Sequence, residues 1–182
     1  VDCGPACISL CQDIQGQTFD YPEEFFKERI HSIRRPRPDD FQIKEAAEKI
    51  KKSKNPIIIS GGGVFYSNAM EELGNFAIKH NIPVTQTVMG YSTMKRDHTH
   101  YAGQIGGLGG KNTNNLAKET DLAIAVGTKL ADFTTGSWAN FENENFNLLS
   151  INVSRFDANK HLAQAVVGDA KVSLIELSKA LG

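Results

Sequence analysis

The stretch IIISGGGVFYS, residues 57–67, decides the fold. Three isoleucines, which favour β-structure, lead into Gly61, Gly62 and Gly63, and a helical pattern begins at Asn68. Glycine allows a tight turn, a positive φ and the close approach of a neighbour. Such a loop, between a buried strand and a helix, is where an α/β sheet presents N–H groups to an anion. A tight turn without a ligand remains an open alternative, because GGGVFY lacks the third glycine of GxGxxG.

Strands and helices alternate on both sides of this loop. Asp39 or Asp40 is expected to cap a helix whose apolar residues recur at i, i+3, i+4 and i+7. The other predicted elements are strands at 56–60, 82–87, 122–126, 148–153 and 165–167, and helices at 68–80, 112–119 and 172–181. Short apolar strands separated by helices or crossovers indicate a parallel sheet covered on both faces. We therefore predict an α/β fold: a three-layer, open, Rossmann-like parallel sheet.

Glycines recur where these strands should end. In an open parallel sheet the carboxyl ends of the strands line the ligand crevice, so these loops predict a nucleotide-binding crevice. The candidate residues are Gly61, Gly62, Gly63, Gly107, Gly109 and Gly127. Ordinary NAD binding is not expected, because Gln86 and Thr87 stand where an acid would bind the ribose.

Charge and cysteine content exclude several classes of protein. A net charge of −1 gives no basis for binding nucleic acid or an anionic membrane. No apolar run approaches the roughly 18 residues of a membrane span. Cys3, Cys7 and Cys11 have no usual metal-site spacing, so we expect buried free thiols and a reducing, cytoplasmic compartment. His98 and His100 are expected to be an exposed pair, and no metal site is predicted.

The N-terminal quarter of the chain follows a different pattern. Residues 4–13 predict a strand without a partner strand, and residues 21–32 predict a helix with Pro22 near its start. The prolines of RRPRP, residues 34–38, exclude a continuing helix and indicate a solvated linker between domains. The first residue is Val1, so we expect the chain to be a piece of something longer.

Several motifs occur in the order found in a known family. They are GGG at 61–63, IPV at 82–84, DH at 97–98, GGLGG at 106–110, ETDLAIAVGTKLADFTTG at 119–136, INV at 151–153 and GDA at 168–170. Together they resemble the central domain of thiamine diphosphate-dependent enzymes. GPACISLCQDIQGQ, at 4–17, resembles the last strand and exit of the pyrimidine-binding domain that precedes it. The resemblance implies three parts: 1–22 as the tail of that domain, 23–40 as helix and linker, and 41–182 as the central domain.

Longer segments point to one branch of the family. QDIQGQTFDYPEEFF (12–26), IRRPRPD (33–39), DFTTGS (132–137) and NVSRFDANKH (152–161) resemble the branch that hydrolyses a carbon–carbon bond of a cyclic trihydroxy-dione in myo-inositol breakdown. The resemblance implies thiamine diphosphate and magnesium, bound by flanking pyrimidine- and diphosphate-binding domains outside this chain, and a full-length homo-oligomer. GDA replaces the GDG of the diphosphate site, and only residues 171–182 follow it. No catalytic residue is therefore expected in this chain.

Some family members hold FAD or an adenosine nucleotide in the crevice of this domain. Lys129, Ala131 and Phe133 stand where the flavin-binding branch has an arginine, an aspartate and a second arginine. A lost guanidinium and a lysine in place of another weaken diphosphate binding, so FAD is not expected. A structural domain without a ligand is the preferred interpretation. A stand-alone module that binds ADP or FAD is the alternative.

Overall fold

A computed structural model describes residues 5–182 of the chain. Its centre is a sheet of six parallel strands in the order β3-β2-β1-β4-β5-β6. The strands are β1 (Pro56–Ser60), β2 (Val84–Gln86), β3 (Tyr101–Gln104), β4 (Leu122–Val126), β5 (Asn147–Asn152) and β6 (Gln164–Val167). The prediction of an open, parallel α/β sheet is confirmed.

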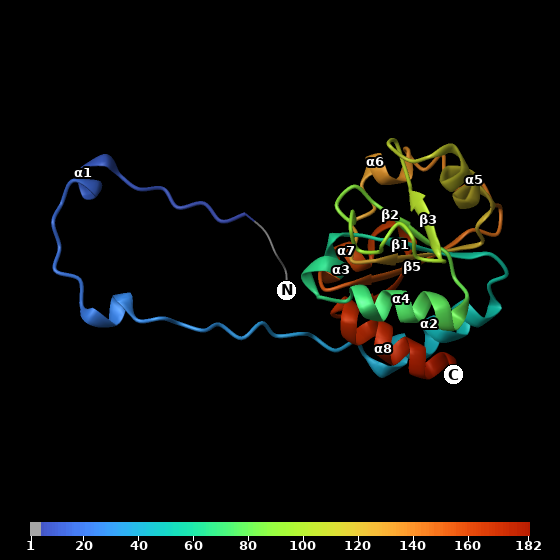
Figure 1. Cartoon of the computed structure of the whole chain (residues 1–182), viewed down its shortest axis with the longest axis horizontal. Helices are drawn as coiled ribbons and strands as arrows, with labels where there is room; N and C mark the ends of the chain where they lie inside the picture. The colour runs from blue at the N-terminus through green and yellow to red at the C-terminus, as the bar shows by residue number, and fades with distance from the viewer. Residues whose placement is uncertain (1–4) are drawn as a thin grey trace.

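Helices cover both faces of this sheet. Figure 1 shows α2 (Asp40–Lys52), α4 (Met70–His80) and α8 (Ala170–Leu181) together on one face. The opposite face carries α5 (Lys111–Glu119) and the short α6 (Asp132–Thr135). The remaining short helices are α1 (Gln12–Gln15), η1 (Glu23–Phe26), α3 (Gly62–Tyr66), α7 (Arg155–Ala158) and η2 (Lys160–Leu162).

The isoleucines of β1 divide between two hydrophobic cores. Ile58 packs in the core under α2, α4 and α8, whereas Ile57 and Ile59 pack in the core on the α5 face. All three side chains are at most 1% exposed. Alternating side chains point to opposite faces of a strand, so a strand buried on both sides must be apolar throughout. Each such isoleucine contributes about 1.5–3 kcal/mol of burial free energy.

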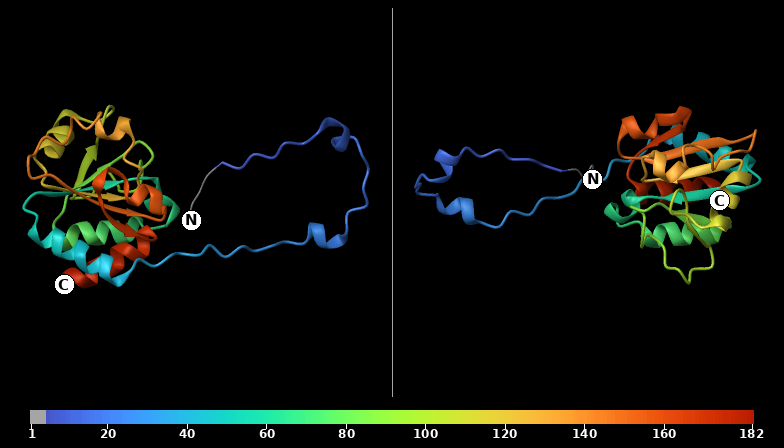
Figure 2. Two further views of the ribbon diagram at one scale, coloured as in Figure 1. Left: turned by 180° about the vertical axis from the view of Figure 1, so that it is seen from behind. Right: turned by 90° about the horizontal axis from the view of Figure 1, so that it is seen from above.

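Residues 5–34 form an arm outside the α/β body (Figures 1 and 2), and every one of them is exposed. The predicted strand at 4–13 is wrong for the described residues 5–13, since 5–11 form no strand and Gln12 begins a helical turn. Of the predicted helix at 21–32 only the turn Glu23–Phe26 forms. Neither a lone strand nor a short isolated helix is stable without something to pack against.

The thiol prediction also fails on this arm. Cys7 and Cys11 are free but exposed, and Cys3 lies outside the described residues.

Strand β3 is a further element that the sequence did not indicate. It contains Gly103 at φ +101, and a bulge interrupts its neighbour between Val84 and Thr85. A glycine inside a strand weakens the pattern by which strands are predicted. No helix within residues 5–182 combines the length and apolar character needed to cross a membrane.

Candidate functional site

A cavity of about 500 Å³ lies at the carboxyl edge of the sheet. It is bounded by the turns and loops that follow β1, β2, β4, β5 and β6. Its lining residues include Gly62, Gly63, Tyr66, Ser67, Val88, Met89, Gly127, Lys129, Phe133, Asp157 and Gly168. Of the six candidate glycines, Gly62, Gly63 and Gly127 line the cavity. Gly61, Gly107 and Gly109 do not belong to its lining.

The glycines after β1 allow two loops to pack backbone against backbone. A Cβ built on Gly61 would lie 2.4 Å from the carbonyl oxygen of Gly127. One on Gly63 would lie 2.6 Å from the Cα of Gly127, which itself has φ +60. No Cβ fits at such distances, so these glycines are required by the contact between the β1 and β4 loops.

Most of the candidate N–H groups are already hydrogen-bonded inside the protein. Gly61 donates to Val126 O at 2.9 Å, and Gly63 donates to Gly127 O at 2.9 Å. Gly127 donates to the carbonyl of Ile151 at 2.8 Å. The pairs in the other loop are Gly107 to Phe133 O at 2.9 Å and Gly109 to Gly106 O at 2.8 Å. Five of the six glycines therefore direct their N–H groups at carbonyls of the chain, not at a phosphate site.

The loop of residues 105–110 packs against α6 beside the cavity. Gly106 has φ +94, and a Cβ there would lie 2.3 Å from the Phe133 carbonyl oxygen. A Cβ on Gly107 would lie 3.1 Å from the Phe133 ring. The glycines of this loop thus accommodate the turn that begins α6.

The mouth of the cavity is largely apolar. Tyr66, Val88, Met89 and Phe133 contribute exposed or partly exposed side chains to it. The charged lining residues are Lys129 and Asp157, and Asp157 is paired with Lys160 at 2.5 Å. Among the described residues that line the cavity, a diphosphate would therefore meet one cation, Lys129, where two arginines would give bidentate contacts.

Gln86, which stands in place of the expected ribose-binding acid, is also committed to internal contacts. Its Nε2 donates to Thr93 Oγ1 at 3.2 Å and to the Met94 carbonyl at 3.0 Å, and the residue is buried. It braces the loop after β2 and is not among the residues that line the cavity.

Asp169, at the end of β6, is fully buried. Its Oδ1 accepts the N–H groups of Lys171 and Val172 and so caps α8. Its Oδ2 accepts from Arg35 Nη1 at 3.0 Å. With both oxygens occupied, this carboxylate does not fit a magnesium ligand of a diphosphate site. Within residues 5–182 no group of three or more His, Cys, Asp or Glu side chains is placed to bind a metal.

Arg35 is a residue whose role sequence reasoning missed. The linker around it was expected to be solvated, but Arg35 is half-buried and Pro38 is buried. Arg35 meets a carboxylate 134 positions away, and no local pattern encodes a contact at that distance along the chain. The one available signal was the acid at 169, since a buried carboxylate requires a cation or hydrogen-bond donors.

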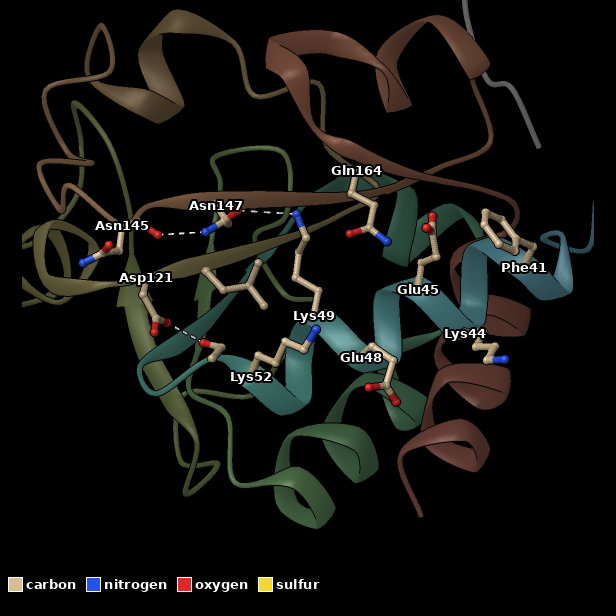
Figure 3. Close-up of a pocket in the computed structure, with 12 residues that line it drawn as sticks. Phe41, Lys44, Glu45, Glu48, Lys49, Lys52, Asp121, Asn145, Asn147 and Gln164 are labelled. Carbon is tan, nitrogen blue, oxygen red and sulfur yellow. Dashed lines mark hydrogen bonds between the residues drawn. The ribbon is translucent and has the colours of Figure 1, made fainter.

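A second hollow, of about 840 Å³, lies at the opposite edge between α2 and the starts of β4, β5 and β6 (Figure 3). Lys44, Lys49 and Lys52 of α2 lie there together with Glu45 and Glu48 of the same helix. Lysines and glutamates of opposite charge on one open helical face are typical of a solvated surface.

Asp121 holds the turn between α2 and β1 beside this hollow. It accepts the Ser53 hydroxyl, the Lys54 N–H at 2.8 Å and the Asn55 N–H at 3.1 Å. Burial raises the pKa of Asp121, but these hydrogen bonds to its charged form outweigh burial and hold the pKa below its usual value. The hollow is therefore bordered by a structural carboxylate.

The sequence is similar to known proteins of one enzyme family. Residues 43–177 match the family model described as thiamine pyrophosphate enzyme, central domain. A 3D-(3,5/4)-trihydroxycyclohexane-1,2-dione hydrolase of Clostridium perfringens (strain 13 / Type A) is 46% identical over 178 residues, which are 98% of this chain and 28% of the relative. The protein of that name from Bacillus anthracis is 44% identical over 97% of this chain and 27% of its own length.

Among solved structures, benzoylformate decarboxylase from Polynucleobacter necessarius superposes with a TM-score of 0.65 at 22% identity. The match covers 88% of this chain and 32% of that one, and it shows the shared fold. The chain spans less than a third of the length of the curated relatives it matches. With three quarters of its residues inside the matched model, the chain belongs to the family of thiamine pyrophosphate enzyme central domains.

Proposed function

We propose that the whole protein is a thiamine diphosphate-dependent hydrolase that opens the ring of a trihydroxycyclohexane-1,2-dione at a carbon–carbon bond, in myo-inositol breakdown. The observation that carries this proposal is the 46% identity to a hydrolase of that name, which extends over 98% of the chain. We further propose that magnesium binds with the cofactor, that the protein is cytoplasmic and that it forms a homo-oligomer. Residues outside this chain supply the chemistry, because Asp169 is committed to Arg35 and to the cap of α8.

Within that protein the described domain joins and spaces its neighbours. The proposed division is 1–22 as the tail of a preceding domain, 23–40 as linker and 41–182 as the central domain. The rings on the arm support it, since Phe19, Tyr21, Phe25 and Phe26 are 56–73% exposed and contact one another. A cluster of exposed rings is typical of a surface that another domain covers.

A binding measurement and an activity measurement test the proposal together. Chain 1–182 should show no binding in titration calorimetry with thiamine diphosphate and magnesium, and no hydrolysis of the dione. The natural full-length protein should bind the cofactor and consume the dione. A micromolar dissociation constant for chain 1–182 would contradict the assignment of the cofactor to other domains. A full-length protein that binds the cofactor but leaves the dione intact would contradict the assigned reaction.

The alternative function is a nucleotide-binding module, and the observation that favours it is the cavity at Gly62, Gly63 and Gly127. A ligand at a hundredfold excess over its dissociation constant would stabilise the domain by about 2.7 kcal/mol. We expect the melting temperature to stay unchanged with millimolar ADP or FAD, because five of the six candidate N–H groups already have acceptors. An upward shift with either nucleotide would favour the module.

A further inference from the structure

The linker from Arg35 to Pro38 lies in a seat formed by Ser67, Gly168 and Asp169. Arg35 Nη1 donates to the Ser67 carbonyl at 2.5 Å and to Asp169 Oδ2 at 3.0 Å. The Asp169 N–H donates in turn to the carbonyl of Pro36 at 2.8 Å. Asp169 thus binds the linker twice: its carboxylate binds the Arg35 side chain, and its backbone N–H binds the Pro36 carbonyl.

Because the Asp169 carboxylate is charged and buried, this contact requires a cation such as Arg35. The Asp169 side chain is 0% exposed and the Arg35 side chain is 33% exposed. Removing the guanidinium would leave a buried carboxylate whose remaining partners are the two N–H groups at the start of α8. Arg35 of the linker is therefore the counter-ion of the buried Asp169 carboxylate. Arg37 differs, because it pairs at 2.9 Å with Glu176 while its own side chain is 70% exposed.

The shape of the seat adds a second, uncharged constraint. Pro38 is buried, and a Cβ built on Gly168 would lie 2.9 Å from the Pro38 nitrogen and 3.0 Å from its Cδ. The proline ring therefore occupies the space that a side chain at position 168 would need. Because proline also fixes its own φ, the backbone between Arg35 and Pro38 has little freedom.

The seat shares its walls with the cavity at the carboxyl edge. Ser67 and Gly168 line that cavity, and Ser67 is also the residue whose carbonyl binds Arg35. The exposed arm, residues 5–34, ends immediately before Arg35. The alignment with the Clostridium relative spans 178 of the 182 residues, so that relative also contains chain that corresponds to most of the arm.

We propose that the Arg35–Asp169 pair is a clamp that fixes where, and in which direction, the preceding part of the chain leaves this domain. The linker is then a rigid connection, and the preceding segment is attached at the carboxyl edge of the sheet. In a protein of several domains such a connection sets the position of the preceding domain relative to the mouth of the cavity. The role is one of positioning, because neither residue needs to touch a substrate or cofactor.

The first test measures the direction of the arm. Spin labels are placed at Ile33→Cys and Lys111→Cys, both on exposed residues, in the full chain with its three cysteines changed to serine. We expect a narrow distribution of label distances in this parent and a broad one after Arg35→Ala or Asp169→Asn. Arg37→Ala is the matched control and should keep the narrow distribution. Equal widths in all four proteins would overturn the proposal.

The second test separates the clamp from general loss of structure. Hydrogen exchange of the Asp169 amide reports its bond to the Pro36 carbonyl directly. Arg35→Ala should accelerate that exchange at least about tenfold, while the amides of β1 and β4 stay protected. Gly168→Ala should accelerate it too, because it displaces Pro38 without touching a charge. Asp169→Asn removes the charge that pairs with Arg35 but keeps a side-chain oxygen that can cap α8. We therefore expect this variant to remain folded while it loses the clamp. Unchanged exchange of the Asp169 amide in Arg35→Ala would show that the pair does not hold the linker.

Discussion

Gly62 and Gly63 are neighbours with opposite tolerance for a side chain. A Cβ on Gly63 would lie 2.6 Å from the Gly127 Cα, which belongs to a backbone that cannot yield easily. A Cβ on Gly62 would lie 3.2 Å from the Met89 carbonyl oxygen, which would have to move by only a few tenths of an ångström. The sequence indicated a constrained glycine turn. It could not indicate which glycine faces a neighbour, because that depends on a loop more than 60 residues away.

We predict that Gly63→Ala destabilises the domain by about 1–3 kcal/mol, the cost of forcing an atom into a packed contact. Gly62→Ala should cost less than about 1 kcal/mol, since alanine also favours the first turn of a helix more than glycine does. Urea denaturation of both variants measures the difference. Equal losses of stability would contradict the backbone contact between the β1 and β4 loops.

Asp121 gives the stability of the domain a dependence on pH. Its pKa in the folded protein is below the reference value of 3.8, so the folded state binds fewer protons on this carboxyl than the unfolded state. The stabilisation is present above the unfolded pKa and is lost as pH falls through the folded pKa. We predict that the stability lost between pH 6 and pH 3 is smaller in Asp121→Asn than in the parent chain. Thermal melts of the two proteins across this range provide the measurement. Parallel curves would show that Asp121 carries no such linkage.

At the scale of single elements, length and periodicity decided which predictions succeeded. The helix from Asp40 to Lys52 carries Ile43, Ala46, Ala47 and Ile50 on its buried face, as its spacing indicated. The strand at 122–126 was predicted with its observed bounds. The elements that failed, in the arm, have apolar residues but no surface to bury them against. Strand β3 escaped prediction because two of its four residues, Ala102 and Gly103, have small side chains that carry little pattern.

The start of α2 offers a test of its cap. The sequence left Asp39 and Asp40 as alternatives, and the structure selects Asp39, which accepts the N–H groups of Phe41 at 2.9 Å and Gln42 at 3.4 Å. Asp39→Ala should therefore cost about 1 kcal/mol. Asp40→Ala should cost less, because it removes only a charge near the helix dipole. Denaturant midpoints of the two variants will distinguish them, and a larger loss for Asp40→Ala would contradict the assigned cap.

At the scale of the whole molecule, the family and the layered architecture could be predicted, but the contacts between the linker and the folded body could not. The prediction placed the central domain at 41–182 with a solvated linker before it. The structure adds Arg35 to Pro38 to the body through contacts with Gly168 and Asp169. Three of the six candidate glycines line a cavity at the carboxyl edge of the sheet. The internal acceptors of the glycine N–H groups follow only from tertiary packing, which no local pattern shows.

Two truncations define this boundary. A chain that starts at Arg35 should melt at the same temperature as the full chain, because residues 5–34 are all exposed. A chain that starts at Asp39 loses the partner of a buried carboxylate, and its melting temperature should fall by at least about 4 °C. Differential scanning calorimetry measures both. If the two truncated chains melt together, the linker is not part of the folded body.

Helix α8 begins at the linker seat and ends at the far edge of the sheet. Asp169 caps its first turn, and near its last turn the Ala180 carbonyl accepts from Lys51 at the end of α2. Its 12 residues span about 18 Å. Segments joined before Arg35 and after Gly182 would thus attach at opposite ends of the domain, and the length of α8 would set the distance between the two attachment points. One residue inserted into that helix would move the attachment point after Gly182 by about 1.5 Å and rotate it by about 100° around the helix axis. The direction in which the second segment leaves the domain would therefore change far more than its distance from the first.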